Sequence, residues 1–183
     1  QFMRISAGSL RGRTFYPPAD KWPTRPTTDI SREALFNILT NRIDFEEIEA
    51  LDLFGGTGAH TYEMISRGCT KITYVDLHRP AVKFTEQTLK AWDCIQFVDI
   101  KCMDFKMFIN NCSVQFDYIF AGPPYPLPDL GSIPDYIFNA AILKETGLFV
   151  LEHNPQYKFN EHPHFIEERK YGQTRFSFFH YKS

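Results

Sequence analysis

A glycine-rich turn at residues 54–58 is the first stretch whose residue types could do chemistry. An apolar run containing Asp52 leads into Gly55, Gly56 and Gly58, and a helical pattern follows. Such a turn brings backbone N–H groups close to a ligand, because glycine has no Cβ to hold the ligand away. The spacing is neither that of a dinucleotide fold nor that of a P-loop, and no lysine follows to hold a triphosphate. The turn alone is therefore compatible with a cofactor site or with an ordinary strand–helix connection.

Polar side chains recur at the ends of the next three predicted strands. The second strand ends in Asp76, whose paired carboxylate oxygens could accept hydrogen bonds from ribose hydroxyls. The third leads to Asp104 and Phe105, an acceptor for an exocyclic amine followed by a ring that could lie against a purine. The fourth runs into a Gly-Pro-Pro-Tyr turn at residues 122–125. Each acid alone could be a helix cap or a surface group, but four successive strand ends favour a nucleoside-binding site.

Strands and helices must alternate to bring these strand ends together. Strands are expected at about 48–54, 71–76, 95–102, 116–121 and 148–152, with helices at about 59–67, 79–92, 105–111 and 134–143. This alternation predicts a parallel sheet covered by helices on both faces, with ligands bound at the carboxyl ends of the strands. Two further runs, 163–171 and 174–181, predict a terminal hairpin that adds one antiparallel strand.

The N-terminal region is basic, whereas the rest of the chain is acidic. Residues 3–16 predict a small β-hairpin with Arg11 and Arg13 at its turn. A helix is expected over about 30–40, capped by Thr28 or Asp29, with an apolar face made of Ile30, Ala34, Leu35, Ile38 and Leu39. Residues 1–32 hold six basic and two acidic side chains, a net charge of +4, which leaves −6 for the remainder. This asymmetry fits a phosphate-binding surface and a solvated arm equally well.

The length and composition of the chain limit the classes of protein to which it can belong. A chain of 183 residues with 43% hydrophobic content is long enough for one compact α/β domain without disulfides. The four cysteines show no C-x-x-C spacing, so we expect reduced thiols in a cytoplasmic, monomeric protein with no metal site. No apolar run is long enough to span a membrane. Gln1 and Phe2 precede Met3, which we expect to be the natural start.

Taken together, these motifs resemble the RsmD family of bacterial S-adenosylmethionine-dependent 16S rRNA (guanine-N2) methyltransferases. The resemblance covers nearly the whole chain from Met3. Its most specific parts are the N-terminal arm and the segment Arg25-Pro26-Thr27-Thr28-Asp29, because any class I methyltransferase could supply the glycine turn. The matching segments are residues 3–8, 11–13, 25–29, 33–39, 51–58, 66–68, 116–120, 123–125, 152–153 and 169–172.

The resemblance implies a fold and a set of roles. The fold would be the α/β, Rossmann-like class I methyltransferase sheet, mostly parallel and seven-stranded, with a C-terminal antiparallel hairpin and a small N-terminal β-hairpin arm. The arm and its loop would span residues 1–29, and the S-adenosylmethionine-binding domain residues 30–183. The methyl donor would be bound by Asp52, Phe54, Gly55, Gly56, Thr57, Gly58, Asp76, Leu77, Asp104 and Phe105. The 16S rRNA of an assembling small ribosomal subunit would be contacted by Arg4, Arg11, Arg13, Arg25, Thr27 and Thr28.

The chain departs from the family pattern at the expected catalytic turn. The family has Asp-Pro-Pro-Tyr there, or Asn in related enzymes, whereas this chain has Gly122 before Pro123, Pro124 and Tyr125. The missing side chain would accept the hydrogens of the guanine amino group and orient its nitrogen toward the methyl donor, and the tyrosine would stack on the base. Losing one positioned electrostatic group commonly costs about 10²–10³ in rate.

Three interpretations of Gly122 are open from the sequence. The enzyme methylates slowly, or another acid (Asp129, Asp135 or Glu152) substitutes, or the glycine is a variant of this copy. We expect a family member whose catalysis is impaired or altered at this position. One alternative is a DNA amino-methyltransferase, which the short chain disfavours because no separate target-recognition domain is present. The other is a catalytically inactive cofactor-binding protein that binds RNA and assists assembly.

Overall fold

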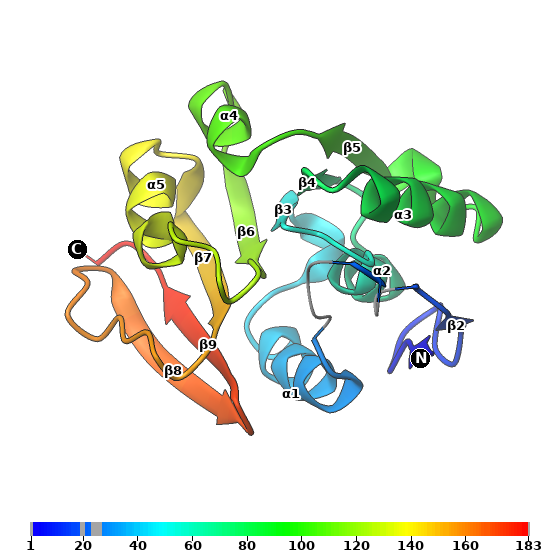
Figure 1. The fold of residues 1–183 in the computed structure, drawn as a ribbon, viewed down its shortest axis with the longest axis horizontal. Coiled ribbons are helices and arrows are strands. Elements are labelled where there is room, and N and C mark those ends of the chain that lie inside the picture. Colours follow the sequence, from blue (N-terminus) through cyan, green and yellow to red (C-terminus); the bar gives the residue numbers. More distant parts are fainter. Residues whose placement is uncertain (1, 19–20, 23–26, 183) are drawn as a thin grey trace.

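A seven-stranded sheet forms the centre of the protein, as the computed structural model of residues 2–18, 21–22 and 27–182 shows (Figure 1). The strand order is β5-β4-β3-β6-β7-β9-β8. The first five of these are mutually parallel, and β9 is antiparallel to both of its neighbours. The predicted sheet with its terminal hairpin is confirmed. The strands are β3 (Ala50–Leu53), β4 (Ile72–Asp76), β5 (Val98–Cys102), β6 (Phe116–Ala121), β7 (Leu143–His153), β8 (Phe165–Tyr171) and β9 (Thr174–Phe179).

Helices cover both faces of this sheet. The helices are α1 (Asp29–Thr40), α2 (Ala59–Ser66), α3 (Arg79–Ala91), α4 (Phe105–Asn110) and α5 (Ile133–Asn139). One core lies between the sheet and α1, α2 and α3, and a second lies between the sheet and α4 and α5. Short 3-10 turns occupy Phe45–Glu47, Ile95–Phe97 and Leu130–Ser132. None of the helices in the described ranges is long and apolar enough to cross a membrane.

Two details of the predicted elements are wrong. The helix expected over 134–143 ends at Asn139, because Ala141 adopts a φ of 55° that turns the chain, and β7 begins two residues later. On α1, Ile30 was expected to be buried, but it is 80% exposed. The buried face consists instead of Ser31, Arg32, Leu35, Phe36 and Leu39. Compared with the predicted orientation, α1 is rotated about its axis so that a charged side chain, Arg32, points inward.

The N-terminal arm is the predicted hairpin, and it packs on helix α2. Its strands β1 (Met3–Arg4) and β2 (Thr14–Phe15) pair antiparallel. Gly8 has a φ of +87°, and a Cβ there would lie 1.9 Å from the carbonyl oxygen of Ser66, so the arm can approach the helix this closely only with glycine. The amide of Ser9 donates to that carbonyl at 2.8 Å, and the amide of Leu10 donates to the Ser66 hydroxyl at 2.9 Å.

A buried carboxylate ties the arm to α1 and α2. Glu63 of α2 is fully buried, and its Oε1 accepts a 2.9 Å hydrogen bond from the amide of Ser6. Arg32 of α1 lies 3.6 Å from the same oxygen, and Arg67 pairs with Oε2. Arg32 also donates to the carbonyl oxygen of Arg4 at 3.0 Å. Because a buried charge must be paired, these contacts hold three separate segments in one arrangement.

We expect Glu63→Gln to lower the free energy of unfolding by about 3–5 kcal/mol, because it leaves Arg67 without its counter-charge and Arg32 with Asp29 as its remaining ion-pair partner. Urea unfolding followed by circular dichroism measures this change. The matched control is Glu86→Gln, which removes an exposed α3 pair with Lys90 and should cost less than about 1 kcal/mol. Equal effects of the two substitutions would show that the Glu63 network does not hold the fold together.

Candidate functional site

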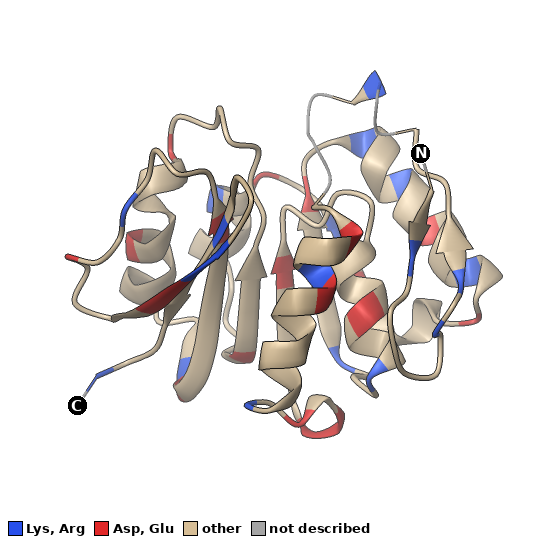
Figure 2. Cartoon of the chain, turned by 90° about the horizontal axis from the view of Figure 1, so that it is seen from below, with Lys and Arg blue, Asp and Glu red and all other residues tan. Residues whose placement is uncertain are grey.

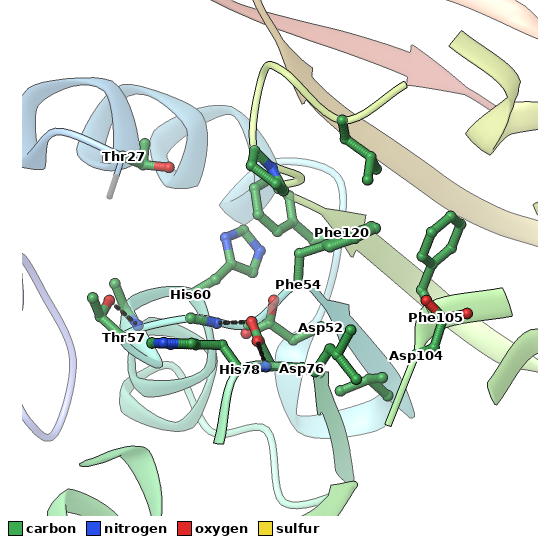
Figure 3. Close-up of a pocket in the computed structure, with 18 of the residues that line it drawn as sticks. Thr27, Asp52, Phe54, Thr57, His60, Asp76, His78, Asp104, Phe105 and Phe120 are labelled. Carbon is green, nitrogen blue, oxygen red and sulfur yellow. Dashed lines mark hydrogen bonds between the residues drawn. The ribbon is translucent and has the colours of Figure 1, made fainter. Parts of the chain in front are cut away.

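A pocket of about 450 Å³ lies at the carboxyl ends of β3, β4, β5 and β6 (Figure 3). Its walls come from the residues that follow each of these strands, together with α1 residues and Thr27. The chain places β4 and β5 on one side of β3, whereas β6 and β7 lie on its other side. The pocket therefore lies at the topological switch point of the sheet, between β3 and β6. Open α/β sheets bind their ligands at such a point, as the sequence predicted.

The glycine turn forms the pocket floor, but its glycines are needed for different reasons. Gly56 lines the pocket with a φ of +52°, and a Cβ there would meet only its own turn. Gly55 also lines the pocket, yet a Cβ on it would lie 2.2 Å from the ring of Tyr74. Gly58 packs behind the turn, where a Cβ would lie 2.5 Å from Tyr62. Two of the three glycines are therefore required by buried tyrosines rather than by the open space of the pocket.

Asp76 joins the end of β4 to this turn. Its Oδ2 accepts a hydrogen bond from the amide of Gly56 at 2.9 Å, and its Oδ1 accepts one from the amide of His78 at 2.7 Å (Figure 3). Burial raises the pKa of Asp76, although these backbone hydrogen bonds oppose the shift. Leu77 is 67% exposed at the pocket rim. Each carboxylate oxygen has two lone pairs, so Asp76 retains acceptor capacity toward the pocket.

Asp104 and Phe105, the residues predicted to bind the adenine, follow β5, and Phe54 at the end of β3 lies beside them. The rings of Phe54 and Phe105 are 4.8 Å apart, and both line the pocket. Phe54 has a φ of 59°, a left-handed conformation that costs a non-glycine residue about 1–2 kcal/mol and that is found most often at functional sites. Asp104 caps α4 by accepting from the amide of Lys106 at 2.9 Å. The capping and ligand-binding interpretations of Asp104 are compatible, because its side chain also lines the pocket.

The Gly-Pro-Pro-Tyr turn contributes two residues to the pocket wall. Gly122 and Pro124 line the pocket, whereas Pro123 is buried behind them. The Tyr125 hydroxyl donates to Oε2 of Glu152 at 2.9 Å. The sequence therefore placed this turn correctly at the pocket, and the structure adds a buried carboxylate that contacts its tyrosine.

The threonines expected to contact RNA have different positions. Thr27 lines the pocket, and its hydroxyl donates to Oε1 of Glu152. Thr28 is the N-cap of α1, where its hydroxyl oxygen accepts from the amide of Ser31 at 3.2 Å. This decides between the two predicted caps, Thr28 and Asp29. Arg25 lies outside the described residues.

The basic residues of the arm lie on its surface. Figure 2 shows Lys and Arg positions recurring along the N-terminal hairpin, where Arg4, Arg11 and Arg13 are exposed. The Arg13 guanidinium lies 5.6 Å from the Trp92 ring, so α3 supports it from one side. Arg32 was counted with this basic region but is 2% exposed, so it adds nothing to the surface charge.

Two buried polar residues of the pocket, Arg32 and His60, were missed by the sequence analysis. Arg32 lines the pocket, and its Nε and Nη1 are buried with no hydrogen-bond partner among the described residues. His60 also lines the pocket, stacked on Phe120 at 3.7 Å and in contact with the Tyr118 hydroxyl at 2.8 Å. Burial, aided by the charge of Arg32, lowers the pKa of His60 well below its ordinary value, so this ring is neutral. The sequence did not indicate that Arg32 points inward, because its partner Glu63 lies on a different helix.

Comparisons with known proteins identify the family. Residues 3–180 match the family model described as "Conserved hypothetical protein 95". The chain is 30% identical to "Putative rRNA methyltransferase YlbH" of Bacillus subtilis over 162 residues, which cover 87% of this chain and 86% of the relative. The chain is an RsmD-family methyltransferase.

A second relative and a solved structure are also similar to this chain. "Ribosomal RNA small subunit methyltransferase D" of Haemophilus influenzae is 32% identical to the RsmD-family chain over 127 residues, which cover 67% of this chain and 64% of the relative. The solved structure titled "Putative methyltransferase yhhF" from Escherichia coli has a TM-score of 0.84 and 22% identity, and the match covers 98% of this chain and 97% of that one. The fold of the RsmD-family chain is thus the predicted class I methyltransferase fold.

Asp52 is the most perturbed acid in the pocket of this RsmD-family chain. It is 1% exposed; Oδ2 accepts a 2.7 Å hydrogen bond from the Thr61 hydroxyl, and Oδ1 has no partner within the described part of the chain. Burial raises its pKa to about 7, and the charge of Asp76 adds to the shift. In the same described ranges, no three His, Cys, Asp or Glu side chains gather in a metal-binding group, and all four cysteines are free.

This pKa predicts how stability changes with pH. Unfolded chains release the Asp52 proton near 3.8, whereas the folded pocket holds it until about 7, so stability is lost as the pH rises between these values. We expect Asp52→Asn, which cannot ionise, to gain about 1.4 kcal/mol over the wild type for each pH unit between about 5 and 7. Urea unfolding at several pH values measures the difference. The control, Asp99→Asn at an exposed β5 position, should show the same pH dependence of unfolding as the wild type. If the difference in unfolding free energy between Asp52→Asn and the wild type does not change with pH, the raised pKa is refuted.

Proposed function

We propose that this enzyme transfers a methyl group from S-adenosylmethionine to the exocyclic N2 amino group of a guanine in 16S rRNA of an assembling small ribosomal subunit. The support from relatives is that two of them carry rRNA methyltransferase names. The observation that carries the proposal is that Arg32 and Asp52 line one pocket beside Asp76, and that each keeps buried polar atoms with no hydrogen-bond partner among the described residues.

The pocket residues fit the methyl donor part by part. The unpartnered nitrogens of Arg32 suit the carboxylate of its methionine moiety, and Oδ1 of Asp52 suits the ammonium group. Asp76 would hold the ribose hydroxyls, and Phe54 and Phe105 would contact the adenine. When bound, the donor supplies a sulfonium methyl carbon: the amino lone pair forms the new N–C bond, the C–S electron pair returns to sulfur, and the nitrogen loses one proton.

The other residues of the chain would hold the RNA. The Gly122–Tyr125 turn contributes to the pocket wall and would receive the target base. The exposed arginines of the arm, Arg4, Arg11 and Arg13, would contact phosphates, which position an RNA without reading its sequence. We therefore keep the division into an RNA-contacting segment, residues 1–29, and a donor-binding domain, residues 30–183. The monomeric state and the cytoplasmic location stay predictions.

We expect Asp76→Ala to raise the dissociation constant for S-adenosylhomocysteine by about 5–150-fold, because unpaired ribose hydroxyls cost about 1–3 kcal/mol. Isothermal titration calorimetry measures the constant, and a thermal melt checks that losing the bonds to Gly56 and His78 leaves the fold intact. Asp99→Ala, on the neighbouring strand and 65% exposed, is the control and should bind like the wild type. An unchanged affinity for Asp76→Ala would remove Asp76 from the donor site.

The reaction itself is tested with methyl-labelled donor and unmodified 16S rRNA, offered both as a free transcript and in reconstituted small subunits. We expect label in one nucleoside, identified by mass spectrometry as N2-methylguanosine. Label on an adenine or cytosine amino group, or transfer to DNA in preference to RNA, would replace the proposed substrate. Donor binding without any transfer would favour the inactive assembly factor.

A further inference from the structure

Glu152 and Gly122 are neighbours across two strands. Strands β6 and β7 run parallel, and Ala121 lies opposite Leu151, so the next pair along the ladder is Gly122 and Glu152. Successive residues of a strand point to opposite faces of the sheet. Ala121 and Leu151 belong to the core beneath α4 and α5, so the next pair faces the side of the sheet that carries α1 and α2.

The space that a side chain at position 122 would enter is bordered by Glu152. A Cβ built on Gly122 would lie 3.8 Å from Oε1 of Glu152 and 3.0 Å from the ring of Phe120. Glu152 is 5% exposed, and its two oxygens accept hydrogen bonds from Thr27 and Tyr125. Thr27 and Gly122 both line the pocket, and Oε1 accepts from the hydroxyl of the first and lies beside the second.

The other acids that could substitute at this turn are engaged elsewhere. Asp129 pairs with Lys106 of α4 at 2.7 Å and is 40% exposed. Asp135 contacts His162 at 3.0 Å and is 69% exposed. Of the three candidates named from the sequence, Glu152 alone is buried beside position 122.

We propose that the carboxylate of Glu152 binds and orients the amino group of the target base, in the place where a side chain at position 122 would otherwise act. This proposal rests on the proposed function and names a further catalytic residue for it. It replaces the expectation that Gly122 leaves the enzyme impaired, because the carboxylate is supplied by the adjacent strand.

The surroundings of Glu152 suit this role. A carboxylate oxygen accepts more than one hydrogen bond, so Oε1 could accept an N–H from the base amino group in addition to the contacts that Glu152 already makes. A buried carboxylate stabilises positive charge that develops on the amino nitrogen, since the low local dielectric strengthens the interaction. Oε1 then receives the proton that the nitrogen loses and passes it to water. The Tyr125 and Thr27 hydroxyls hold the carboxylate in one position throughout.

The test compares Glu152→Gln with Glu145→Gln, the same substitution at an exposed position near the other end of β7. Methyl transfer to unmodified 16S rRNA in reconstituted small subunits gives kcat and KM, and calorimetry gives the affinity for S-adenosylhomocysteine. We expect Glu152→Gln to lower kcat by about 10²–10³-fold, with KM and donor affinity changed less than about threefold. Glu145→Gln should behave like the wild type.

A second pair of variants separates the carboxylate from the packing around it. Gly122→Asp in the Glu152→Gln background should regain at least about tenfold in kcat, because it returns a carboxylate to the same space. Gly122→Ala in that background places the same Cβ against the ring of Phe120 but adds no carboxylate, so kcat should not recover.

Three outcomes would overturn the assignment of Glu152. One is a kcat for Glu152→Gln within about threefold of the wild type. Another is a loss of donor affinity or thermal stability that accounts for the loss of transfer, which would make Glu152 a structural support for Tyr125 and Thr27. The third is equal recovery with aspartate and alanine at position 122. If the wild type itself transfers no methyl group to the RNA, the proposed function fails and this role fails with it.

Discussion

The buried charge of Glu63 is the constraint on which the functional site depends. Its carboxylate binds the arm through Ser6, and it draws Arg32 of α1 and Arg67 inward. Turning Arg32 inward sets the rotation of α1, which exposes Ile30 and brings the start of the helix over the pocket. Thr27, just before that helix, then reaches Glu152 on β7. A single buried side chain on α2 thus links the arm, through α1 and Thr27, to Glu152 beside the Gly122–Tyr125 turn.

Opposite charges divide the pocket into regions of different chemistry. Asp52 and Asp76 lie near the ends of adjacent strands, and the charge of Asp76 adds to the burial that raises the pKa of Asp52. Arg32 lies on the α1 side with unpartnered nitrogens, and it helps to keep His60 neutral. A ligand with one positive and one negative group would give a partner both to the buried oxygen of Asp52 and to the buried nitrogens of Arg32. The proposed methyl donor carries an ammonium and a carboxylate group, and Asp52 and Arg32 offer one buried unpartnered oxygen and two buried unpartnered nitrogens to them.

Much of this could be predicted from the sequence, because the information was local. Alternating apolar runs predicted the sheet, and residues directly after each strand predicted the pocket walls. The sequence-based predictions fail where the position of a residue depends on a partner far away in the chain. The inward position of Arg32 depends on Glu63, and the need for glycine at positions 55 and 58 depends on Tyr74 and Tyr62. The pairing of Gly122 with Glu152 follows from the register of β6 against β7, which no spacing along the chain reveals.

The position of β9 between β7 and β8 has a consequence for synthesis on the ribosome. Strand β7 carries Glu152, and its second edge pairs with β9, which begins more than twenty residues later and after β8. A nascent chain that has emerged only as far as Glu152 therefore presents β7 with an open, apolar edge. The strands that carry the proposed donor-binding residues, β3, β4 and β5, are all synthesised by that stage, whereas β7 lacks its partner until β9 follows. The order of translation thus completes the strands of the proposed donor site before the strand pairing next to Glu152.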